Sequence, residues 1–254
     1  MVTTYLTDCD TLPDPLEAEE LLNRLPGEQV KKIRRIRHLS GRKQSFAVWL
    51  LLSYLLQQKA GIFLKNPGNI AACIEYQRYG KPVCQGIPFS LSHTGHYAIV
   101  SMADTVCKPK ETVGCDIEQE KTYRPKIVRR FFHEAEYVCL EQAQTTQQDE
   151  LFCRYWTRKE SVLKLTGLGM KLPMELFDVT GNRCEIDRKK SNAWWQTVND
   201  EEKQQPEFMQ ALQLLAETPL FFFGYRYDSC QIAVCSTKNQ FSPDIVVVDG
   251  EILA

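Results

Sequence analysis

The feature that most constrains the fold is a helical segment whose apolar side chains lie on nearly every side. It covers residues 42–60 and includes the run from Phe46 to Leu56. A helix that is apolar all round has to be covered by other parts of the protein, and the β-like runs that follow it indicate a sheet. The run is far shorter than the roughly 18–20 apolar residues of a membrane span. The sequence therefore predicts a buried helix packed on a sheet.

A second long helix is predicted over residues 149–165, because Gly167-Leu168-Gly169 then supplies an ending. Each long helix is followed later by a pair of β-like runs. The pairs are residues 89–91 with 97–102 and residues 221–227 with 231–236. This repetition predicts an α+β fold with α/β layers, built from two similar subdomains about a pseudo-two-fold axis. The active site is expected in the cleft between them.

A polar stretch divides the two halves. Residues 103–112 contain Lys108-Pro109-Lys110 and few apolar side chains. We therefore expect an N-terminal subdomain over residues 1–108 and a C-terminal subdomain over residues 109–254. Residues 245–253 are predicted to form either a final edge strand or a tail.

Composition argues against several classes of protein. A net charge of −1 over 254 residues gives no support for bulk nucleic-acid binding. The ten cysteines form no CxxC pair and there are only four histidines, so a structural zinc site is not expected. The N-terminus, MVTTYLTDCD, lacks the basic and apolar regions of a signal peptide. We expect reduced thiols and a cytoplasmic protein without a membrane segment.

Two acids stand at the end of a strand predicted over residues 113–117. Alternate side chains of a strand share a face, so Asp116 and Glu118 are expected to point the same way while Ile117 points into the core. Two solvent-facing acids on an edge strand would show the same pattern. The small and apolar residues before Asp116 favour the buried end of a central strand, where a divalent cation would relieve the repulsion between the carboxylates.

A helix contributes a third acid and a lysine. Glu160 and Lys164 are four residues apart, which places them on one helical face, and Trp156 lies one turn earlier. On an exposed face this would be a surface ion pair worth about 0.3–0.5 kcal/mol. Trp156 indicates a partly buried face, where a metal-bound pyrophosphate would supply partners for both charges. Glu136 could equally be an ordinary helix acid.

Basic residues and a serine-histidine pair indicate where an anion would bind. Residues 31–43 carry seven lysines and arginines and no acid, and they form either a solvated helix face or a phosphate-collecting patch. Ser92-His93 could be a nucleophile and its base, but adjacent strand residues point to opposite faces and no G-x-S-x-G is present. Donors to a phosphate at a turn are the favoured interpretation.

In order along the chain, these motifs resemble those of the 4′-phosphopantetheinyl transferases of the larger, surfactin-synthetase type. That family carries G-K-P, S-x-S-H, G-[I/V]-D-[I/V]-E, F-F-x-x-x-E-Y and W-x-x-K-E-[S/A]-x-x-K elements. The matching stretches are Gly80-Lys81-Pro82, Ser90-Leu91-Ser92-His93, Gly114-Cys115-Asp116-Ile117-Glu118, Phe131-Phe132-His133-Glu134-Ala135-Glu136-Tyr137 and Trp156-Thr157-Arg158-Lys159-Glu160-Ser161-Val162-Leu163-Lys164. Cys115 departs mildly from the usual isoleucine or valine.

The resemblance implies an activity and a set of roles. The reaction would move the 4′-phosphopantetheine group of coenzyme A to a serine of an apo carrier protein and release adenosine 3′,5′-bisphosphate. Asp116, Glu118 and Glu160 would hold Mg²⁺, and Lys164 would neutralise the same pyrophosphate. Glu160 would take the serine proton, with Glu136 acting through a water as the alternative.

The resemblance also implies how the two substrates bind. The nucleotide phosphates of coenzyme A are expected to contact Lys32, Lys81, Ser92 and His93, with Arg42 or Lys43. An acidic carrier protein (an acyl or peptidyl carrier) would dock on basic and apolar surface formed by Lys126, Val128, Arg129 and Arg130. Two similar halves in one chain make a pseudo-dimer, so we expect a monomer.

Two other functions would use some of the same features. A Mg²⁺-dependent phosphodiesterase or nuclease needs the acids but neither a coenzyme A pocket nor the S-x-S-H element. A non-catalytic protein that binds coenzyme A or carriers would be free to lose the acids, yet the three acids and Lys164 are present. The transferase is therefore the leading hypothesis.

Overall fold

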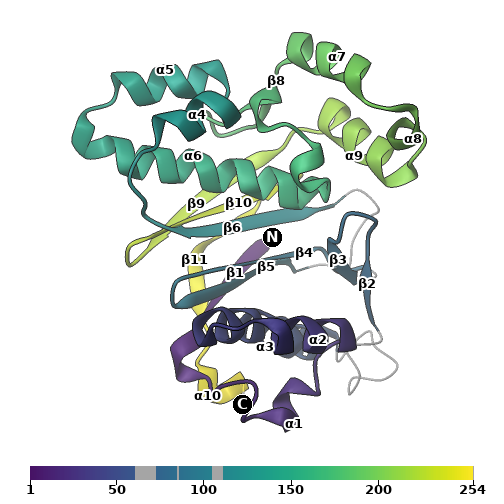
Figure 1. Cartoon of the computed structure of the whole chain (residues 1–254), viewed down its shortest axis with the longest axis vertical. Coiled ribbons are helices and arrows are strands. Elements are labelled where there is room, and N and C mark those ends of the chain that lie inside the picture. The colour runs from purple at the N-terminus through teal and green to yellow at the C-terminus, as the bar shows by residue number, and fades with distance from the viewer. Residues whose placement is uncertain (61–72, 85, 105–110, 254) are drawn as a thin grey trace.

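The computed structural model describes residues 1–60, 73–84, 86–104 and 111–253. Two β-sheets lie face to face, and helices cover the outer face of each (Figure 1). One apolar core lies between each sheet and its helices, and a third core lies between the two sheets. The fold is mixed α+β in layers, which confirms the predicted class.

The first sheet has four strands in the order β11-β1-β5-β4. They are β1 (Val2–Asp8), β4 (Phe89–Thr94), β5 (Tyr97–Ala103) and β11 (Phe241–Val247). The interior strand β5 is apolar along its length because both faces are buried. Its Val100 belongs to the core under the long helix α3 (Leu39–Ala60), and its Ile99 to the core between the sheets. The predicted buried helix is therefore present and packs on a sheet.

The second sheet has the order β6-β10-β9, with β6 (Val113–Gln119), β9 (Phe221–Tyr227) and β10 (Cys230–Ser236). On β6, Cys115 and Ile117 face the core between the sheets. Gly114 faces helix α6 (Thr145–Thr166), where an added Cβ would lie 1.9 Å from the carbonyl oxygen of Ser161. Only glycine permits this approach, and strand alternation then turns Asp116 toward α6 as well.

The two sheets meet along their edge strands. β4 borders β6, where the backbone N–H of Cys115 donates to Ser90 Oγ at 2.9 Å. At the other border β11 lies beside β9, and the rings of Phe223 and Phe241 stack with centroids 5.6 Å apart. The sheets are therefore joined on both sides, and Asp116 sits at the β4–β6 border.

The remaining elements fill in the two helical layers. On the N-terminal side they are η1 (Cys9–Thr11), α1 (Glu19–Leu22), α2 (Gly27–Arg35), β2 (Ile74–Tyr76), β3 (Pro82–Cys84) and α10 (Gly250–Leu253). On the C-terminal side they are α4 (Pro125–Phe131), α5 (Glu134–Gln142), η3 (Gly169–Lys171), η4 (Met174–Leu176), β7 (Phe177–Asp178), β8 (Glu185–Ile186), α7 (Arg188–Thr197), α8 (Asp200–Lys203) and α9 (Pro206–Glu217). α6 ends where predicted, at Gly167 with φ 73°.

Each half sends a segment into the other. β11 pairs in parallel with β1, and Val248 and Leu253 enter the core under α3. The last residues thus form an edge strand followed by a short helix. In the opposite direction, Tyr79 from the β2–β3 turn packs on the core of the C-terminal half. The predicted boundary between residues 108 and 109 lies outside the described residues, and the division into two subdomains stays a prediction.

The elements expected to be equivalent are all found. α3 and α6 each have 22 residues, and β4–β5 and β9–β10 are antiparallel pairs. The pseudo-two-fold axis itself stays a prediction. Across the described residues, no helix is both long and apolar enough to span a membrane, and the cysteines there are free thiols.

Candidate active site

Three hydroxyls on β4 face β6 and form one border of the site. Ser90, Ser92 and Thr94 alternate along the strand and therefore share a face. Ser92 Oγ donates to Asp116 Oδ1 at 2.8 Å, and Thr94 Oγ1 donates to Glu118 Oε2 at 3.3 Å. The side chains of one half thus hold the acids of the other.

Asp116 is the centre of the cluster. Its side chain is buried, and the Lys164 ammonium lies 2.7 Å from Oδ1 and 2.7 Å from Ser92 Oγ. Burial raises the pKa of Asp116 even though Lys164 and Ser92 act to lower it. Burial alone would lower the pKa of Lys164, but the facing Asp116 carboxylate leaves it raised. Asp116, Ser92 and Lys164 therefore form one hydrogen-bonded contact in the lining of the site.

Glu160 lies one helical turn before Lys164 on α6. Burial, followed by the negative charges of Asp116 and Glu118, raises the pKa of Glu160 to about 7, although Lys164 opposes the shift. A carboxyl with a pKa near neutrality exchanges protons at physiological pH, which is what a general base requires. Glu160 is thus a candidate for a functional role in this cluster.

These side chains surround a cavity of about 520 Å³ between α2, α3, β4, β6 and α6. A cavity of this size accepts a small-molecule ligand. Local desolvation and the nearby Lys164 charge lower the pKa of His93, although the residue is exposed overall. The lining residues are Gln29, Ser45, Val48, Trp49, Leu91, Ser92, His93, Asp116, Ile117, Glu118, Trp156, Glu160 and Lys164.

The acids fit a hard divalent cation by their chemistry. Asp116 Oδ2 is buried and has no hydrogen-bond partner among the residues that the structure describes, and such an oxygen is costly to bury unless something binds it. Among the described residues, however, no three acidic, imidazole or thiol side chains stand close enough together to hold a metal. The fit therefore rests on the donor set and the orphaned oxygen.

The structure does not bring the basic residues of the 31–43 run into the cavity lining. Arg42 forms a two-point ion pair with Asp14, with Nη2 2.7 Å from Oδ2, and it also donates to two backbone carbonyls. Lys43 Nζ donates to the Asp10 carbonyl at 3.3 Å. Lys32 is exposed, with its Nζ 5.6 Å from the ring centroid of Tyr76.

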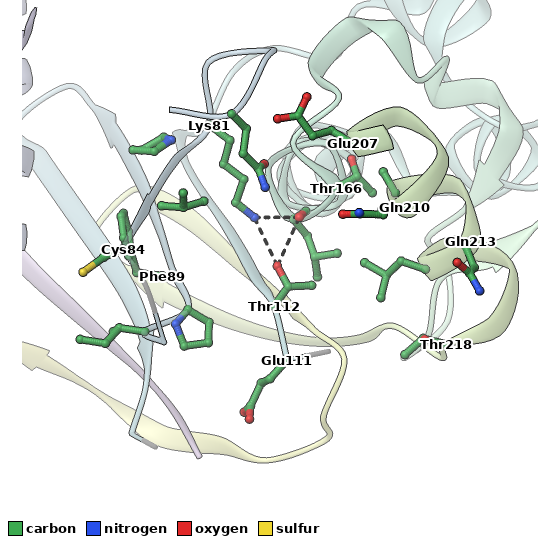
Figure 2. A pocket seen from close by; sticks show the side chains of 18 of the residues that line it. Lys81, Cys84, Phe89, Glu111, Thr112, Thr166, Glu207, Gln210, Gln213 and Thr218 are labelled. Atoms are coloured by element: carbon green, nitrogen blue, oxygen red, sulfur yellow. Dashed lines mark hydrogen bonds between the residues drawn. The ribbon is translucent and has the colours of Figure 1, made fainter. Parts of the chain in front are cut away.

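Lys81 lines a second cavity of about 670 Å³, between α9 and the β3–β4 segment (Figure 2). Its Nζ donates to Thr112 Oγ1 and to the carbonyls of Val113 and Leu165. Burial lowers the pKa of Lys81 to about 8. The ammonium is therefore engaged with protein oxygens, away from Asp116.

Glu136 lies in the interior of the C-terminal half. Its Oε1 is 2.9 Å from Lys159 Nζ and accepts from the Val179 N–H, while Oε2 accepts from the His133 N–H. Both Glu136 and Lys159 are fully buried. With every oxygen occupied, Glu136 has the surroundings of a structural residue.

The predicted carrier surface is partly wrong. Lys126, Arg129 and Arg130 on α4 are exposed, but Val128 is 0 % exposed and belongs to the C-terminal core. α4 is amphipathic, so its basic neighbours face solvent while Val128 points inward. Val128 is therefore removed from the docking surface.

Sequence reasoning missed the wall of the cavity contributed by the N-terminal half. Gln29, Ser45 and Trp49 line it. Gln29 and Ile33 are buried on one face of α2, so their four-residue spacing was a usable signal. Nothing in the sequence indicated which face of α3 borders the cavity, because that helix is apolar nearly all round.

A buried acid–lysine cluster in which Glu160 has a raised pKa, placed where two sheets meet, is typical of an enzyme's site. Residues 112–225 match the model of the 4′-phosphopantetheinyl transferase superfamily. A 4′-phosphopantetheinyl transferase of Bacillus subtilis is 31% identical over 64% of this chain and 69% of its own length. The B. subtilis 4′-phosphopantetheinyl transferase ffp is 27% identical over 93% of each chain, and Sfp of strain 168 is 25% identical over 92% of each. The chain belongs to the 4′-phosphopantetheinyl transferase superfamily and is a transferase.

Proposed function

We propose that this protein transfers the 4′-phosphopantetheine group of coenzyme A to a serine hydroxyl of an apo carrier protein in a Mg²⁺-dependent reaction. The serine oxygen forms a bond to the β-phosphorus of coenzyme A. The bond from that phosphorus to the bridging oxygen breaks, and adenosine 3′,5′-bisphosphate leaves. This assignment rests on family membership together with the acid–lysine cluster in the cavity.

Each charged residue of the cluster has a role in this proposal. Glu160 in its carboxylate form takes the serine proton, because it lines the cavity beside the two acids that would share the metal with it. Its pKa of about 7 belongs to the metal-free site, and a bound cation would lower it. Lys164 places a positive charge where the pyrophosphate would lie. His93 lines the same wall and offers a further donor, whereas the Ser92 hydroxyl proton is already donated to Asp116. Glu136 is not used as a base here, because Lys159 and two backbone N–H groups occupy its oxygens.

Asp116, Glu118 and Glu160 would hold Mg²⁺, which when bound offsets charge on the pyrophosphate and aligns it. Their side chains do not form a ready three-ligand group in the described parts of the chain. The assignment is carried by Asp116 Oδ2, a buried oxygen without a hydrogen-bond partner among the described residues, which lies near the two other acids. Ser92 and Lys164 both engage Oδ1, so the opposite oxygen is the one left for a metal.

An acidic carrier protein would meet basic surface next to Glu118. Arg124, Lys126, Arg129 and Arg130 are exposed on and before α4. A small groove of about 130 Å³ lies between this basic stretch and α6. It is lined by Glu118, Lys121, Arg124, Ile127, Phe152, Cys153 and Trp156. An apolar side chain of the carrier in this groove would bring the carrier serine close to the acids. We place the protein in the cytoplasm as a monomer.

The direct test is to incubate the protein with Mg²⁺, coenzyme A and several apo carrier domains, followed by intact mass spectrometry of each carrier. Transfer adds one phosphopantetheine group to the carrier. Asp116→Ala should abolish the addition while the circular dichroism spectrum stays native. A wild-type protein that modifies none of the carriers would overturn the proposal, and an active Asp116→Ala would overturn the metal assignment.

A further inference from the structure

Lys81 ties together the two elements that carry the acid cluster. Its Nζ lies 2.7 Å from the Leu165 carbonyl oxygen on α6 and 3.4 Å from the Val113 carbonyl oxygen on β6. It also lies 3.3 Å from Thr112 Oγ1, a contact that Figure 2 shows as a dashed line. Leu165 directly follows Lys164 in the chain, and Val113 opens the strand that carries Asp116. One side chain from the N-terminal half therefore holds both elements at the same point.

The contact with Leu165 is a helix cap supplied from far along the chain. The last four carbonyls of a helix have no partner within it, and the carboxyl end carries a partial negative charge. On α6 the Leu163 carbonyl accepts from the Gly167 N–H. The Leu165 carbonyl accepts from Lys81 and, at 3.4 Å, from Thr112 Oγ1. A lysine is suited to this position because it supplies both a proton and a positive charge.

The turn that carries Lys81 is itself held by the C-terminal half. The Tyr79 hydroxyl donates to Glu202 on α8, whose other oxygen is 2.7 Å from Lys171 Nζ. The backbone N–H of Arg78 donates to Glu207 on α9 at 3.3 Å. The position of Lys81 therefore depends on a turn fastened at two further points.

The surroundings of Lys81 are unsuited to a phosphate group. An ammonium has three protons, and three protein oxygens lie within hydrogen-bond distance of Nζ. The neighbouring cavity is lined by Glu207 and Glu217, whose negative charges do not favour an anion. Glu111 also lines it, but its carboxylate is paired with Lys238 at 2.6 Å. Figure 2 shows Glu111 and Glu207 around this cavity. Lys81 is thus better placed to organise the protein than to bind a substrate phosphate.

We propose that Lys81 is a positioning residue, which caps α6 and fixes its last turn against β6 so that Lys164 stays beside Asp116. Glu160, one turn earlier on the same helix, keeps its position by the same contact. The inference rests on the proposed transfer reaction and replaces the phosphate-binding role that the resemblance implied for Lys81.

The test compares Lys81→Met, which keeps the length of the side chain without its charge, with Lys81→Arg. Lys189→Met, at an exposed position on α7, is the control for the loss of one positive charge. Calorimetry with coenzyme A gives the Kd and the fraction of competent sites, and carrier modification gives kcat per competent site. Hydrogen exchange at residues 163–166 reports the end of α6 and requires no turnover.

In Lys81→Met we expect kcat per competent site to fall about ten- to a hundredfold, because a small misplacement of reacting groups is costly. The Kd and KM for coenzyme A should stay within about twofold of wild type, since no ligand contact is lost. Exchange at the end of α6 should accelerate. Lys81→Arg should regain much of kcat, and Lys189→Met should match wild type.

Two results would overturn the proposal. If Lys81 binds a phosphate of coenzyme A, Lys81→Met would raise the Kd for coenzyme A about tenfold or more and would keep kcat at saturation. If Lys81 is needed only for folding, Lys81→Met would lower the fraction of competent sites and leave kcat per competent site unchanged. If the wild-type protein bound coenzyme A but modified no carrier, the proposed function would fail. The exchange rates at α6 would then still decide whether Lys81 caps the helix.

Discussion

Ser92 and Asp116 join two different sheets, because the Ser92 hydroxyl on β4 donates to the Asp116 carboxylate on β6 at 2.8 Å. Lys164 bridges the same pair, with its Nζ 2.7 Å from each partner atom. A contact across the border between the halves therefore sets the charge at the centre of the site. The cluster is complete only when the two sheets are in register.

Replacing Ser92 with alanine removes a donor to Asp116 and an acceptor for Lys164. A hydrogen bond to a charged group is worth about 1.5–3 kcal/mol, so we expect turnover to fall about ten- to a hundredfold. Carrier modification under saturating coenzyme A measures the loss.

The matched control for Ser92→Ala is Thr94→Val, the next hydroxyl on the same strand face. Thr94 Oγ1 donates to Glu118 Oε2 at 3.3 Å, and the same oxygen also accepts from Lys121 Nζ at 2.6 Å. Because Glu118 retains the Lys121 contact, Thr94→Val should lower turnover less than about threefold. Equal losses in the two variants would show that Ser92 has no special part in the cluster.

The raised pKa of Glu160 makes the stability of the metal-free protein depend on pH. Its pKa is about 7 in the folded protein and about 4.5 in the unfolded chain, so between these values the folded state binds more protons. The free energy of unfolding should therefore fall as pH rises from about 4.5 to 7, by about 3 kcal/mol. Urea denaturation at a series of pH values in EDTA measures this.

Glu160→Gln carries no charge and should flatten that part of the pH profile. Adding Mg²⁺ to the wild-type protein should flatten it as well, because a bound cation favours the carboxylate. A profile that is identical in the wild-type protein and in Glu160→Gln would mean that Glu160 does not titrate in this range.

The acid cluster was predictable because it follows from two local periodicities. Alternation along a strand puts Asp116 and Glu118 on one side, and four-residue spacing on a helix aligns Glu160 with Lys164. The motif resemblance then linked the strand to the helix. The layered fold was predictable for a similar reason, since an apolar helix and paired strands leave few arrangements that bury both.

The partners of the basic residues were not predictable, because they lie far away in the chain. Arg42 pairs with Asp14, 28 residues before it, and Lys81 meets Leu165, 84 residues after it. A long flexible side chain takes whichever oxygen the fold brings near, and a local pattern does not identify it. The prediction that Val128 is on the surface is wrong for a simpler reason, because an apolar residue does not share the exposure of its basic neighbours on a helix.

Gly114 should be among the positions least tolerant of a side chain. A Cβ there would lie 1.9 Å from the Ser161 carbonyl oxygen and 2.5 Å from the Leu165 nitrogen, both backbone atoms of α6. Gly114→Ala should push the helix away from β6, costing about 3 kcal/mol or more of stability and most of the activity. Chemical denaturation and carrier modification measure the two effects.

Gly224→Ala on β9 is the control for Gly114→Ala. Its added Cβ would come no closer than 3.6 Å to another part of the chain, at the Ile232 carbonyl oxygen. We expect near-normal stability and full activity. If Gly114→Ala behaved in the same way, β6 and α6 would not be packed as closely as described.

The buried pair Glu136–Lys159 should contribute to stability rather than to catalysis. Lys159 Nζ lies 2.9 Å from Glu136 Oε1 and donates to the carbonyls of Met174 and Phe177, so it joins α5 and α6 to η4 and β7. Lys159→Met leaves a buried carboxylate without its countercharge, which costs about 3–5 kcal/mol in such pairs. Urea denaturation at pH 7 measures the change.

The double variant Glu136→Gln with Lys159→Met should recover part of that loss, because no uncompensated charge remains in the core. The control is Lys171→Met, which breaks the more exposed ion pair between Lys171 and Glu202. This variant should lower the free energy of unfolding by less than about 1 kcal/mol. Glu136→Gln alone should keep kcat per folded molecule close to that of the wild type. A fall in kcat without a loss of stability would instead make Glu136 the base, and Glu160 would lose that role.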